Sequence, residues 1–285
     1  MPAEVIDNPW HGLRRFTRAR IALGRAGDSL PTDAVLDFGL AHAQARDAVH
    51  HPLDVAALCS ALEAMGLPSL IVRSAAADRA QYLLRPDLGR RLNPSDIGVL
   101  ERALDSERAG GTTMFAAGTG GLDPTSAVRA GQRASVGGAT HRAPRVVFVI
   151  ADGLSAIAPQ RHALPLLSVI LARLDGWSVG PVVVATQSRV ALGDEIGERL
   201  GADGVVMLIG ERPGLSSPDS LGLYVTWAPR TGRTDAERNC ISNVRPEGLA
   251  YDTAARKLHY VLTRAQALGA TGIALKDDSD APHRI

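Results

Sequence analysis

The chain has 285 residues, with 31 Lys and Arg balanced by 30 Asp and Glu. A chain of this length forms one large domain or two ordinary ones, and it can bury a core without disulfide bonds. The near-zero net charge provides no field that attracts nucleic acid or an anionic membrane, and no apolar run approaches the roughly 20 residues of a membrane span. Cys59 and Cys240 lack metal-ligand spacing and fit a reducing compartment, so we expect a cytoplasmic protein.

Residues 1–109 are expected to form a mainly helical region. Apolar residues at helical spacing predict helices over 32–49 and 55–65. Short apolar runs predict strands at 70–72 and 82–84.

Two segments of this region are open to a functional and a structural interpretation. The arginine-rich segment 14–20 is either a solvated helix face or, given the interleaved Phe16 and the flanking glycines, a docking arm for a protein partner. The segment 82–92 is either an interface loop or a structural turn with a local Asp-Arg pair.

Residues 110–143 are rich in Gly, Ala, Thr and Ser and lack periodicity, which predicts a flexible insertion. The pattern Gly118-x-Gly120 in this segment is no dinucleotide-binding fingerprint. It follows no predicted strand, and Asp123 stands where a Gly or Ala is required.

Residues 144–285 alternate between strand and helix patterns. Continuous apolar, β-branched runs are typical of parallel strands that are buried on both faces. We therefore predict an α/β fold, a Rossmann-like open parallel sheet that follows the helical N-terminal region. The expected strands are 146–150, 181–185, 205–209, 221–227 and an edge strand at 272–275. The expected helices are 161–175, 194–200 and 252–268.

The candidate ligand residues follow these strands, because open α/β sheets bind ligands outside the carboxyl ends of their strands. Asp152 either touches a ligand or caps the following helix, and Glu211 either accepts hydrogen bonds from ligand amides or pairs with a neighbouring arginine, Arg212 or Arg230. Cys240 is either a small buried side chain or part of a ligand-contacting loop. The sequence contains no phosphate-binding loop, nucleophile elbow or zinc-ligand spacing.

Four segments of the chain resemble the small (light) subunit of adenosylcobalamin-dependent ethanolamine ammonia-lyase. They are residues 13–27, 82–92, 149–155 and 209–248. The last segment is the most specific, because it contains the turn Gly-Glu-Arg-Pro-Gly and the block that begins Cys-Ile-Ser-Asn. The stretch from about 109 to 144 does not take part in the resemblance.

The resemblance implies a hetero-oligomer with several copies of two chains, often within a bacterial microcompartment. The large subunit of this family is a TIM-type barrel that carries ethanolamine and the catalytic residues, and the small subunit closes over the cobalamin. The complex converts ethanolamine to acetaldehyde and ammonia by a radical mechanism. The family's cofactor contacts on the small subunit correspond here to Val190, Glu211 and Cys240, and no catalytic or metal-ligating residue is expected on this chain.

The residue types agree with that division of labour. Cobalamin presents a rim of amide side chains, so holding it requires many modest hydrogen bonds and little acid-base chemistry. The Asp-x-His-x-x-Gly pattern, which replaces cobalamin's own base with a histidine, is absent, and we expect the base to stay on cobalt. Two alternatives remain: a non-catalytic assembly or scaffold subunit, and a stand-alone nucleotide-binding Rossmann enzyme.

Overall fold

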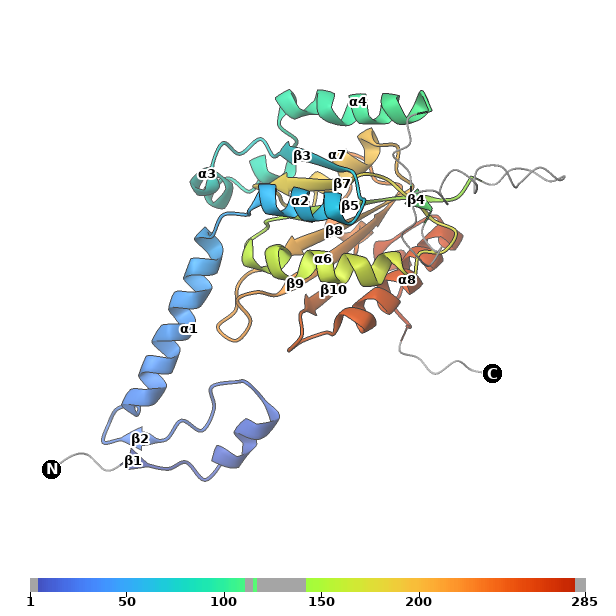
Figure 1. Cartoon of the computed structure of the whole chain (residues 1–285). Helices are drawn as coiled ribbons and strands as arrows, with labels where there is room; N and C mark the ends of the chain where they lie inside the picture. The colour runs from blue at the N-terminus through green and yellow to red at the C-terminus, as the bar shows by residue number, and fades with distance from the viewer. Residues whose placement is uncertain (1–4, 111–114, 117–141, 280–285) are drawn as a thin grey trace, which may run out of the picture.

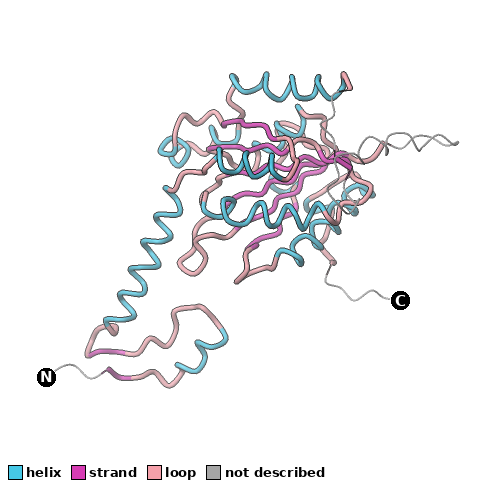
Figure 2. The backbone as a smooth tube through the Cα atoms, viewed as in Figure 1, coloured by secondary structure: helices cyan, strands magenta, loops and turns pink. Residues whose placement is uncertain are grey.

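The computed structural model of this chain describes residues 5–110, 115–116 and 142–279. Within these residues, an eight-stranded sheet forms the centre of the molecule, and helices cover both of its faces (Figure 1 and Figure 2). The α/β class is thus confirmed. The parallel strands, in spatial order, are β3 (Ser69–Arg73), β7 (Val182–Thr186), β5 (Arg145–Ala151) and β8 (Gly204–Gly210).

The edge of the sheet beyond β8 is antiparallel, which corrects the prediction of an open parallel sheet. Strand β9 (Leu221–Trp227) follows β8 through the loop 211–220, which contains no helix, and connections of this kind join antiparallel neighbours. Strand β10 (Asn239–Val244) then pairs antiparallel with β9. The sequence predicted no strand at β10, because its exposed polar residues interrupt the apolar pattern.

Two short strands complete the sheet. Strand β6 (Ser178–Val179) comes directly before β7 in the chain and pairs with the beginning of β5. Strand β4 (Phe115–Ala116) pairs antiparallel with β6. The rest of the predicted insertion, including the Gly118-x-Gly120 pattern, lies outside the described residues.

The five predicted helices are all confirmed, with shifted ends, and the structure adds α4, which was not predicted. The largest shift is in α6, which begins four residues before the predicted start and ends four residues before the predicted end. The helices are α1 (Thr32–His50), α2 (Val55–Ala64), α4 (Ile97–Arg108), α6 (Ile157–Leu171), α7 (Leu192–Arg199) and α8 (Tyr251–Leu268).

The two faces of the sheet carry separate hydrophobic cores. Alternate side chains of β5 point to opposite faces, so Phe148 lies in the core beneath α2, α6 and α8, while Val149 lies in the core beneath α4 and α7. Both side chains are fully buried. Each such side chain stabilises the fold by roughly 1.5–3 kcal/mol relative to exposure.

Two predicted strands are wrong. Residues 82–84 end the helix α3 (Arg79–Leu84), which begins where the Asp78 carboxylate accepts a hydrogen bond from the backbone N–H of Gln81. Residues 272–275 form a 3-10 turn and its end, with the Ile273 side chain 91% exposed. An edge strand would have buried one of its faces.

Helix α1 extends away from the sheet and carries the N-terminal arm at its far end (Figure 1). The arm contains the two-stranded hairpin of β1 (Val5–Ile6) and β2 (Arg25–Ala26) and a 3-10 helix (His11–Phe16). None of the helices in the described part of the chain is long and apolar enough to cross a membrane.

The backbones that leave β5 and β8 touch each other directly. Gly153 has a φ of +56°, and a Cβ atom on it would lie 2.2 Å from the carbonyl oxygen of Gly210. A Cβ on Gly210 would lie 2.0 Å from the carbonyl oxygen of Ser155. The N–H of Leu154 donates to the Gly210 carbonyl at 2.9 Å. These positions have no room for a larger residue.

The close approach predicts that Gly210→Ala destabilises the protein by about 3 kcal/mol, because the contact is with backbone that cannot move aside cheaply. Gly39→Ala is the matched control: Gly39 lies in α1, a Cβ on it would meet no atom within 4 Å, and alanine is expected to add up to about 1 kcal/mol. Urea denaturation measures both. Equal stability of the two variants would contradict the prediction.

Candidate functional site

Glu211 follows the last residue of β8 and ties three strands together. Its carboxylate accepts hydrogen bonds from the hydroxyls of Ser220, just before β9, and Ser242, on β10, the latter at 2.5 Å. The backbone N–H of Asn243 donates to the same carboxylate at 3.2 Å. The side chain is therefore fixed at the carboxyl end of β8, where the antiparallel edge of the sheet begins.

The predicted alternative, an ion pair of Glu211 with Arg212 or Arg230, does not form within the described residues. A carboxylate has about four acceptor positions, and the three hydrogen bonds above leave one of them for a further donor. Glu211 is half-buried, so that position is reachable from one side.

Cys240 lies on β10 directly opposite Tyr224 on β9. The phenol of Tyr224 and the thiol are therefore close neighbours across the two strands. The residue as a whole is exposed, but the atoms around the thiol desolvate it and raise its pKa, and the charge of Glu211 adds to the rise. Cys240 is therefore a neutral thiol near pH 7, and not the buried small side chain that was the alternative.

Tyr224 was missed by the sequence analysis. Burial raises its pKa, and the neighbouring Cys240 and Glu211 raise it further, so the three side chains form one cluster. A Cβ on Gly222 would lie 2.9 Å from Glu211 Oε1 and 3.2 Å from the Tyr224 ring, so glycine makes room for both groups. The alternation of Gly222 and Tyr224 on one face of β9 is the signal that identifies this position.

Val190 lies in the loop between β7 and α7 and is half-buried. It packs against the core beneath α4 and α7, and Tyr224 packs against the same core. The three residues implied by the resemblance are thus divided: Glu211 and Cys240 lie in one cluster, and Val190 lies on the same face of the sheet, at the end of β7.

Helix α7 connects the two parts of this face. Asp194, on its first turn, forms an ion pair with Arg238, which stands two residues before Cys240. Both side chains are 2% exposed. The pair therefore fixes β10 relative to the helix that follows Val190.

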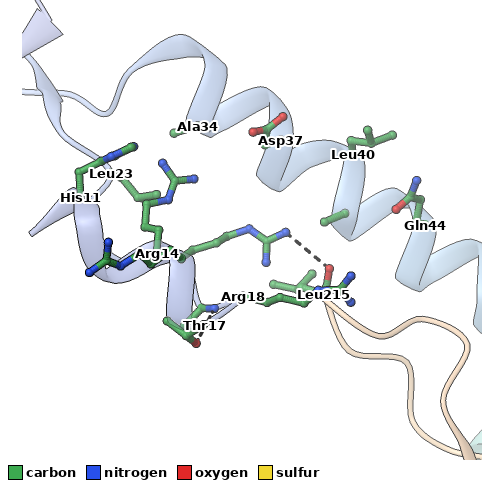
Figure 3. Close-up of a pocket in the computed structure, with 14 residues that line it drawn as sticks. His11, Arg14, Thr17, Arg18, Leu23, Ala34, Asp37, Leu40, Gln44 and Leu215 are labelled. Carbon is green, nitrogen blue, oxygen red and sulfur yellow. Dashed lines mark hydrogen bonds between the residues drawn. The ribbon is translucent and has the colours of Figure 1, made fainter. Parts of the chain in front are cut away.

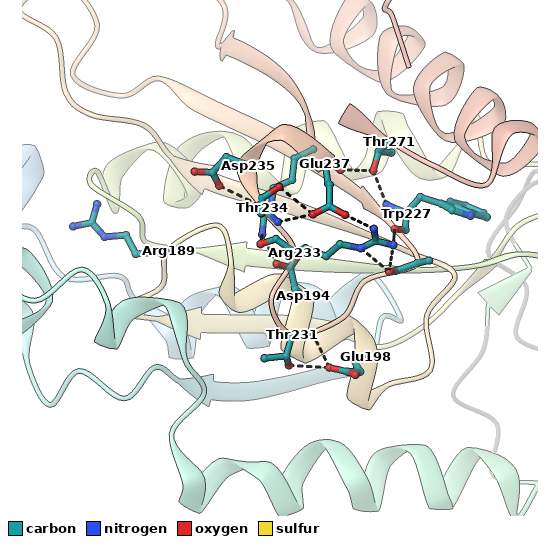
Figure 4. A network of polar contacts seen from close by, with 12 residues as sticks. Arg189, Asp194, Glu198, Trp227, Thr231, Arg233, Thr234, Asp235, Glu237 and Thr271 are labelled. Atoms are coloured by element: carbon teal, nitrogen blue, oxygen red, sulfur yellow. Dashed lines mark hydrogen bonds and ion pairs between the residues drawn. The ribbon is translucent and has the colours of Figure 1, made fainter. Parts of the chain in front are cut away.

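A wider polar network holds the loop 228–238 in place (Figure 4). Thr234 and Glu237 form a capping box, and Glu237 also pairs with Arg233 at 2.5 Å. At the other end, the hydroxyl of Thr231 donates to Glu198 on α7 at 2.8 Å. The loop before β10 is thus anchored at several points, as a rigid contact surface requires.

Asp152 holds the loop before Val190 and does not cap the following helix α6, which begins at Ile157 without a side-chain cap, so the predicted capping role is wrong. It is buried at the end of β5 and accepts hydrogen bonds from the N–H groups of Gln187 and Ser188 at 2.8 and 2.9 Å. Its carboxylate also pairs with Arg79 at 3.5 Å. Burial raises the pKa of Asp152, and the two backbone hydrogen bonds oppose that rise.

The segment 82–92 packs on the same loop. The Tyr82 hydroxyl donates to the carbonyl of Ser188 at 3.1 Å, and the backbone N–H of Arg189 donates to the carbonyl of Gly89 at 2.8 Å. Arg85 and Asp87 form the expected local ion pair at 2.8 Å. Within this chain the segment is a structural turn that positions the residues before Val190.

Two buried polar atoms of this loop have no hydrogen-bond partner among the described residues. They are Oε1 of Gln187, an acceptor, and Nε of Arg189, a donor. Gln187 also has a φ of +55°, which few non-glycine residues adopt. Orphaned groups of this kind beside a half-exposed surface suit a ligand that carries both amide donors and acceptors. No group of three His, Cys, Asp or Glu residues in the described chain could hold a metal ion.

The N-terminal arm forms a second candidate surface. A cavity of about 670 Å³ lies between the arm and α1 (Figure 3), and its polar lining includes Arg14, Arg18 and Arg20. Leu215, from the loop after Glu211, closes one side, and its carbonyl accepts a hydrogen bond from Arg20 at 3.5 Å. Large apolar side chains of the arm stand exposed nearby, such as Phe16 at 74%.

The Asp194–Arg238 pair predicts a pH effect on stability. Burial raises the pKa of Asp194 to about 6, and the charge of Arg238 opposes the rise. Because the folded-state pKa lies above the ordinary 3.8, the contribution of Asp194 to stability is fully present below pH 4 and is lost as the pH rises through 6. The free energy of unfolding of the wild type, relative to Asp194→Asn, should fall by roughly 1–2 kcal/mol from pH 4 to pH 7.

Urea denaturation of both proteins across this pH range measures the difference. Asp235→Asn, which removes the exposed carboxylate that also pairs with Arg238, is the control for loss of a charge at this arginine. If the free energy of unfolding of the wild type, relative to Asp194→Asn, rises with pH or stays constant, the raised pKa of Asp194 is contradicted.

Comparison with known proteins identifies the family. The sequence model of the ethanolamine ammonia-lyase light chain (EutC) matches residues 7–118 and 123–276. It therefore covers most of the 110–143 segment, which corrects its exclusion from the resemblance.

Curated relatives match over nearly their whole length. The chain is 53% identical to the ethanolamine ammonia-lyase small subunit of Azotobacter vinelandii, over 96% of this chain and 90% of the relative. It is 52% identical to the corresponding protein of Ralstonia nicotianae, over 99% and 93% of the two chains. For Pseudomonas aeruginosa the identity is 50%, over 98% and 91%. With matches of this length and identity, the chain belongs to the ethanolamine ammonia-lyase light chain family.

Proposed function

We propose that this chain is the small subunit of an ethanolamine ammonia-lyase that binds adenosylcobalamin at its boundary with a large subunit. The complex converts ethanolamine to acetaldehyde and ammonia. The large subunit, a TIM-type barrel, carries the substrate and the catalytic residues, and several copies of both chains assemble in the cytoplasm, within a bacterial microcompartment. The observation that carries the proposal is the cluster of Glu211, Tyr224 and Cys240 on the same sheet face as Val190.

The donor and acceptor groups on this face suit the periphery of a corrin. Cobalamin carries neutral amide side chains, each of which donates and accepts hydrogen bonds. Glu211 has one acceptor position left, and Gln187 has an unpartnered buried oxygen. The half-exposed Val190 and the Tyr224 ring supply apolar contact area between these polar groups.

The role of this chain is to bind, orient and exclude water. When bound, adenosylcobalamin would supply the radical chemistry of the reaction, and Glu211, Gln187 and Val190 would hold its periphery. The raised pKa of Cys240 keeps a nucleophilic thiolate away from the cofactor. The anchored loop 228–238 presents a fixed wall, and a fixed wall costs no reorganisation when the second subunit closes the site.

A stand-alone nucleotide-binding enzyme is disfavoured by the residues between β5 and β7. In open α/β sheets, a nucleotide binds in the crevice where neighbouring strands send their connections to opposite faces. Here that position lies between β5, which continues into α6 on one face, and β7, which continues into α7 on the other. The buried carboxylate of Asp152 stands there and takes the backbone N–H groups of Gln187 and Ser188, where a phosphate would need free N–H groups.

The exposed apolar side chains and arginines of the N-terminal arm favour a second role in docking on a protein partner. This role is compatible with cofactor binding by the sheet face. A pure scaffold subunit would use the arm surface and would not bind the cofactor. Mutation of the sheet face alone therefore distinguishes a scaffold subunit from a cofactor-binding subunit.

The test is corrinoid binding by the purified complex of this chain with its large subunit. Combined Glu211→Gln and Cys240→Ala substitutions should weaken cobalamin binding at least about tenfold in a spectroscopic titration, because they remove a charged acceptor and a contact on β10. Glu63→Gln, which neutralises an exposed carboxylate on α2, is the control and should leave the affinity unchanged.

Unchanged affinity in the double variant would favour the scaffold role, and a wild-type complex without corrinoid affinity would end the proposal. Thermal unfolding of each variant separates loss of binding from loss of the fold, because Glu211 also joins three strands.

A further inference from the structure

Arg189 forms no ion pair with any carboxylate in the part of the chain that the structure describes. It is half-buried, and its Nε atom is buried without a hydrogen-bond partner among the described residues. Between residues 51 and 279, every other buried or half-buried arginine that the structure describes forms an ion pair with a carboxylate. These arginines are Arg79, Arg145, Arg173, Arg199, Arg233, Arg238 and Arg245.

An uncompensated guanidinium in this setting is costly, because burial removes water and no carboxylate replaces it. The neighbouring Asp152 does not pair with Arg189, because the partners of Asp152 are Arg79 and the backbone of the loop. The structure therefore contains a cation that is prepared for an anion from outside the chain.

The guanidinium of Arg189 is held in one orientation. Its plane lies over the Tyr82 ring, with 4.3 Å between the guanidinium carbon and the ring centre. One terminal nitrogen donates weakly to the Tyr82 carbonyl at 3.4 Å, and the backbone is fixed by Gly89. A Cβ on Gly89 would lie 2.8 Å from Arg189 Cγ, so glycine leaves the space through which the side chain passes. Such stacking suits arginine and not lysine.

Arg189 stands directly before Val190, on the sheet face that the proposed function assigns to cobalamin. Figure 4 shows its side chain directed away from the network that anchors the loop 228–238. The periphery of cobalamin carries neutral amides and a single anionic group, the phosphodiester of its nucleotide loop. Resting on the proposed function, we infer that Arg189 binds this phosphodiester and thereby orients the nucleotide loop against this subunit.

Arg212 is the alternative candidate for binding the phosphodiester, because it follows Glu211 directly in sequence. It is exposed, and no ring stacks on it in the described chain. An exposed arginine must lose side-chain freedom and hydration when it binds an anion, whereas Arg189 has already lost both. The two residues form a matched pair for mutation.

The experiment compares two corrinoids in the complex of this chain with its large subunit. Cobinamide has the corrin ring and its amides but lacks the phosphodiester and the base, so it reports every contact except the proposed one. Dissociation constants are measured by absorbance titration with cyanocobalamin and dicyanocobinamide, for the wild type and for Arg189→Gln, Arg189→Lys and Arg212→Gln. Binding is the readout, so catalytic turnover is not needed.

Arg189→Gln should weaken cobalamin binding about ten- to hundredfold, the worth of a charge-assisted hydrogen bond, and change cobinamide binding less than about threefold. Arg189→Lys keeps the charge and should recover part of the loss. Arg212→Gln should leave the ratio of the two dissociation constants unchanged.

Three results would overturn the inference while wild-type cobalamin binding stands. They are an equal loss for both corrinoids in Arg189→Gln, a selective loss in Arg212→Gln instead, and loss of the large subunit from the Arg189→Gln complex, which would make the anion a carboxylate of that subunit. A wild-type complex that binds neither corrinoid would refute the proposed function itself, and the two failures are therefore distinguishable.

Discussion

The buried ion pair between Asp194 and Arg238 determines the geometry of the candidate surface. The surface is assembled from distant parts of the chain, since Val190 follows a parallel strand and Cys240 lies on an antiparallel edge strand. Helix α7 follows Val190 directly, and the ion pair attaches its first turn to Arg238, the residue before β10. Without it, the loop 228–238 would keep its own capping box and ion pair and its contacts with Asp203, Glu198 and the C-terminal turn, but would lose its buried charged contact with the first turn of α7.

An ion pair of this kind contributes orientation more than net stability. Taking both charges out of water costs about as much as their attraction returns, but removing one partner leaves the other buried and unpaired, at roughly 3–5 kcal/mol. The carboxylate of Glu211 likewise fixes the orientation of its hydroxyl and backbone partners, and the carboxylate of Asp152 fixes the loop before Val190. Polar groups thus fix the rims of the surface, and the two hydrophobic cores fix the sheet beneath it. The exception is Arg189, whose charge is left for a ligand.

The sequence was sufficient to predict the parallel half of the fold. Continuous runs of valine and isoleucine in β5 and β8 can be satisfied only by burial on both faces, and the helices between strands followed from their periodicity. It was insufficient for β10, in which only Ile241 and Val244 face the core across a β-bulge. The tertiary setting also overrode the apolar run at 82–84, where the Asp78 cap and the stacking of Tyr82 between two arginines favour a helix.

The candidate site also contains residues that the sequence could predict and residues that it could not. Glu211 and Cys240 were candidates from their place in the sequence and from resemblance to a family, and the structure explains their proximity through the β8–β9–β10 register. Tyr224, the partner of Cys240, and the orphaned atoms of Gln187 and Arg189 depend on contacts between segments more than a hundred residues apart in places, such as Tyr82 and Ser188. Apart from the alternation of Gly222 and Tyr224 on β9, no pattern within one segment could reveal these groups.

The most direct measurement of the central claim is the alkylation rate of Cys240 in the complex with its large subunit, with and without cobalamin. Mass spectrometry after iodoacetamide treatment reports both cysteines, and Cys59, half-buried beside α6 on the other face of the sheet, is the internal reference. Cobalamin should slow the alkylation of Cys240 several-fold and leave that of Cys59 unchanged. An unchanged rate at Cys240 under saturating cobalamin would contradict contact between this face and the cofactor.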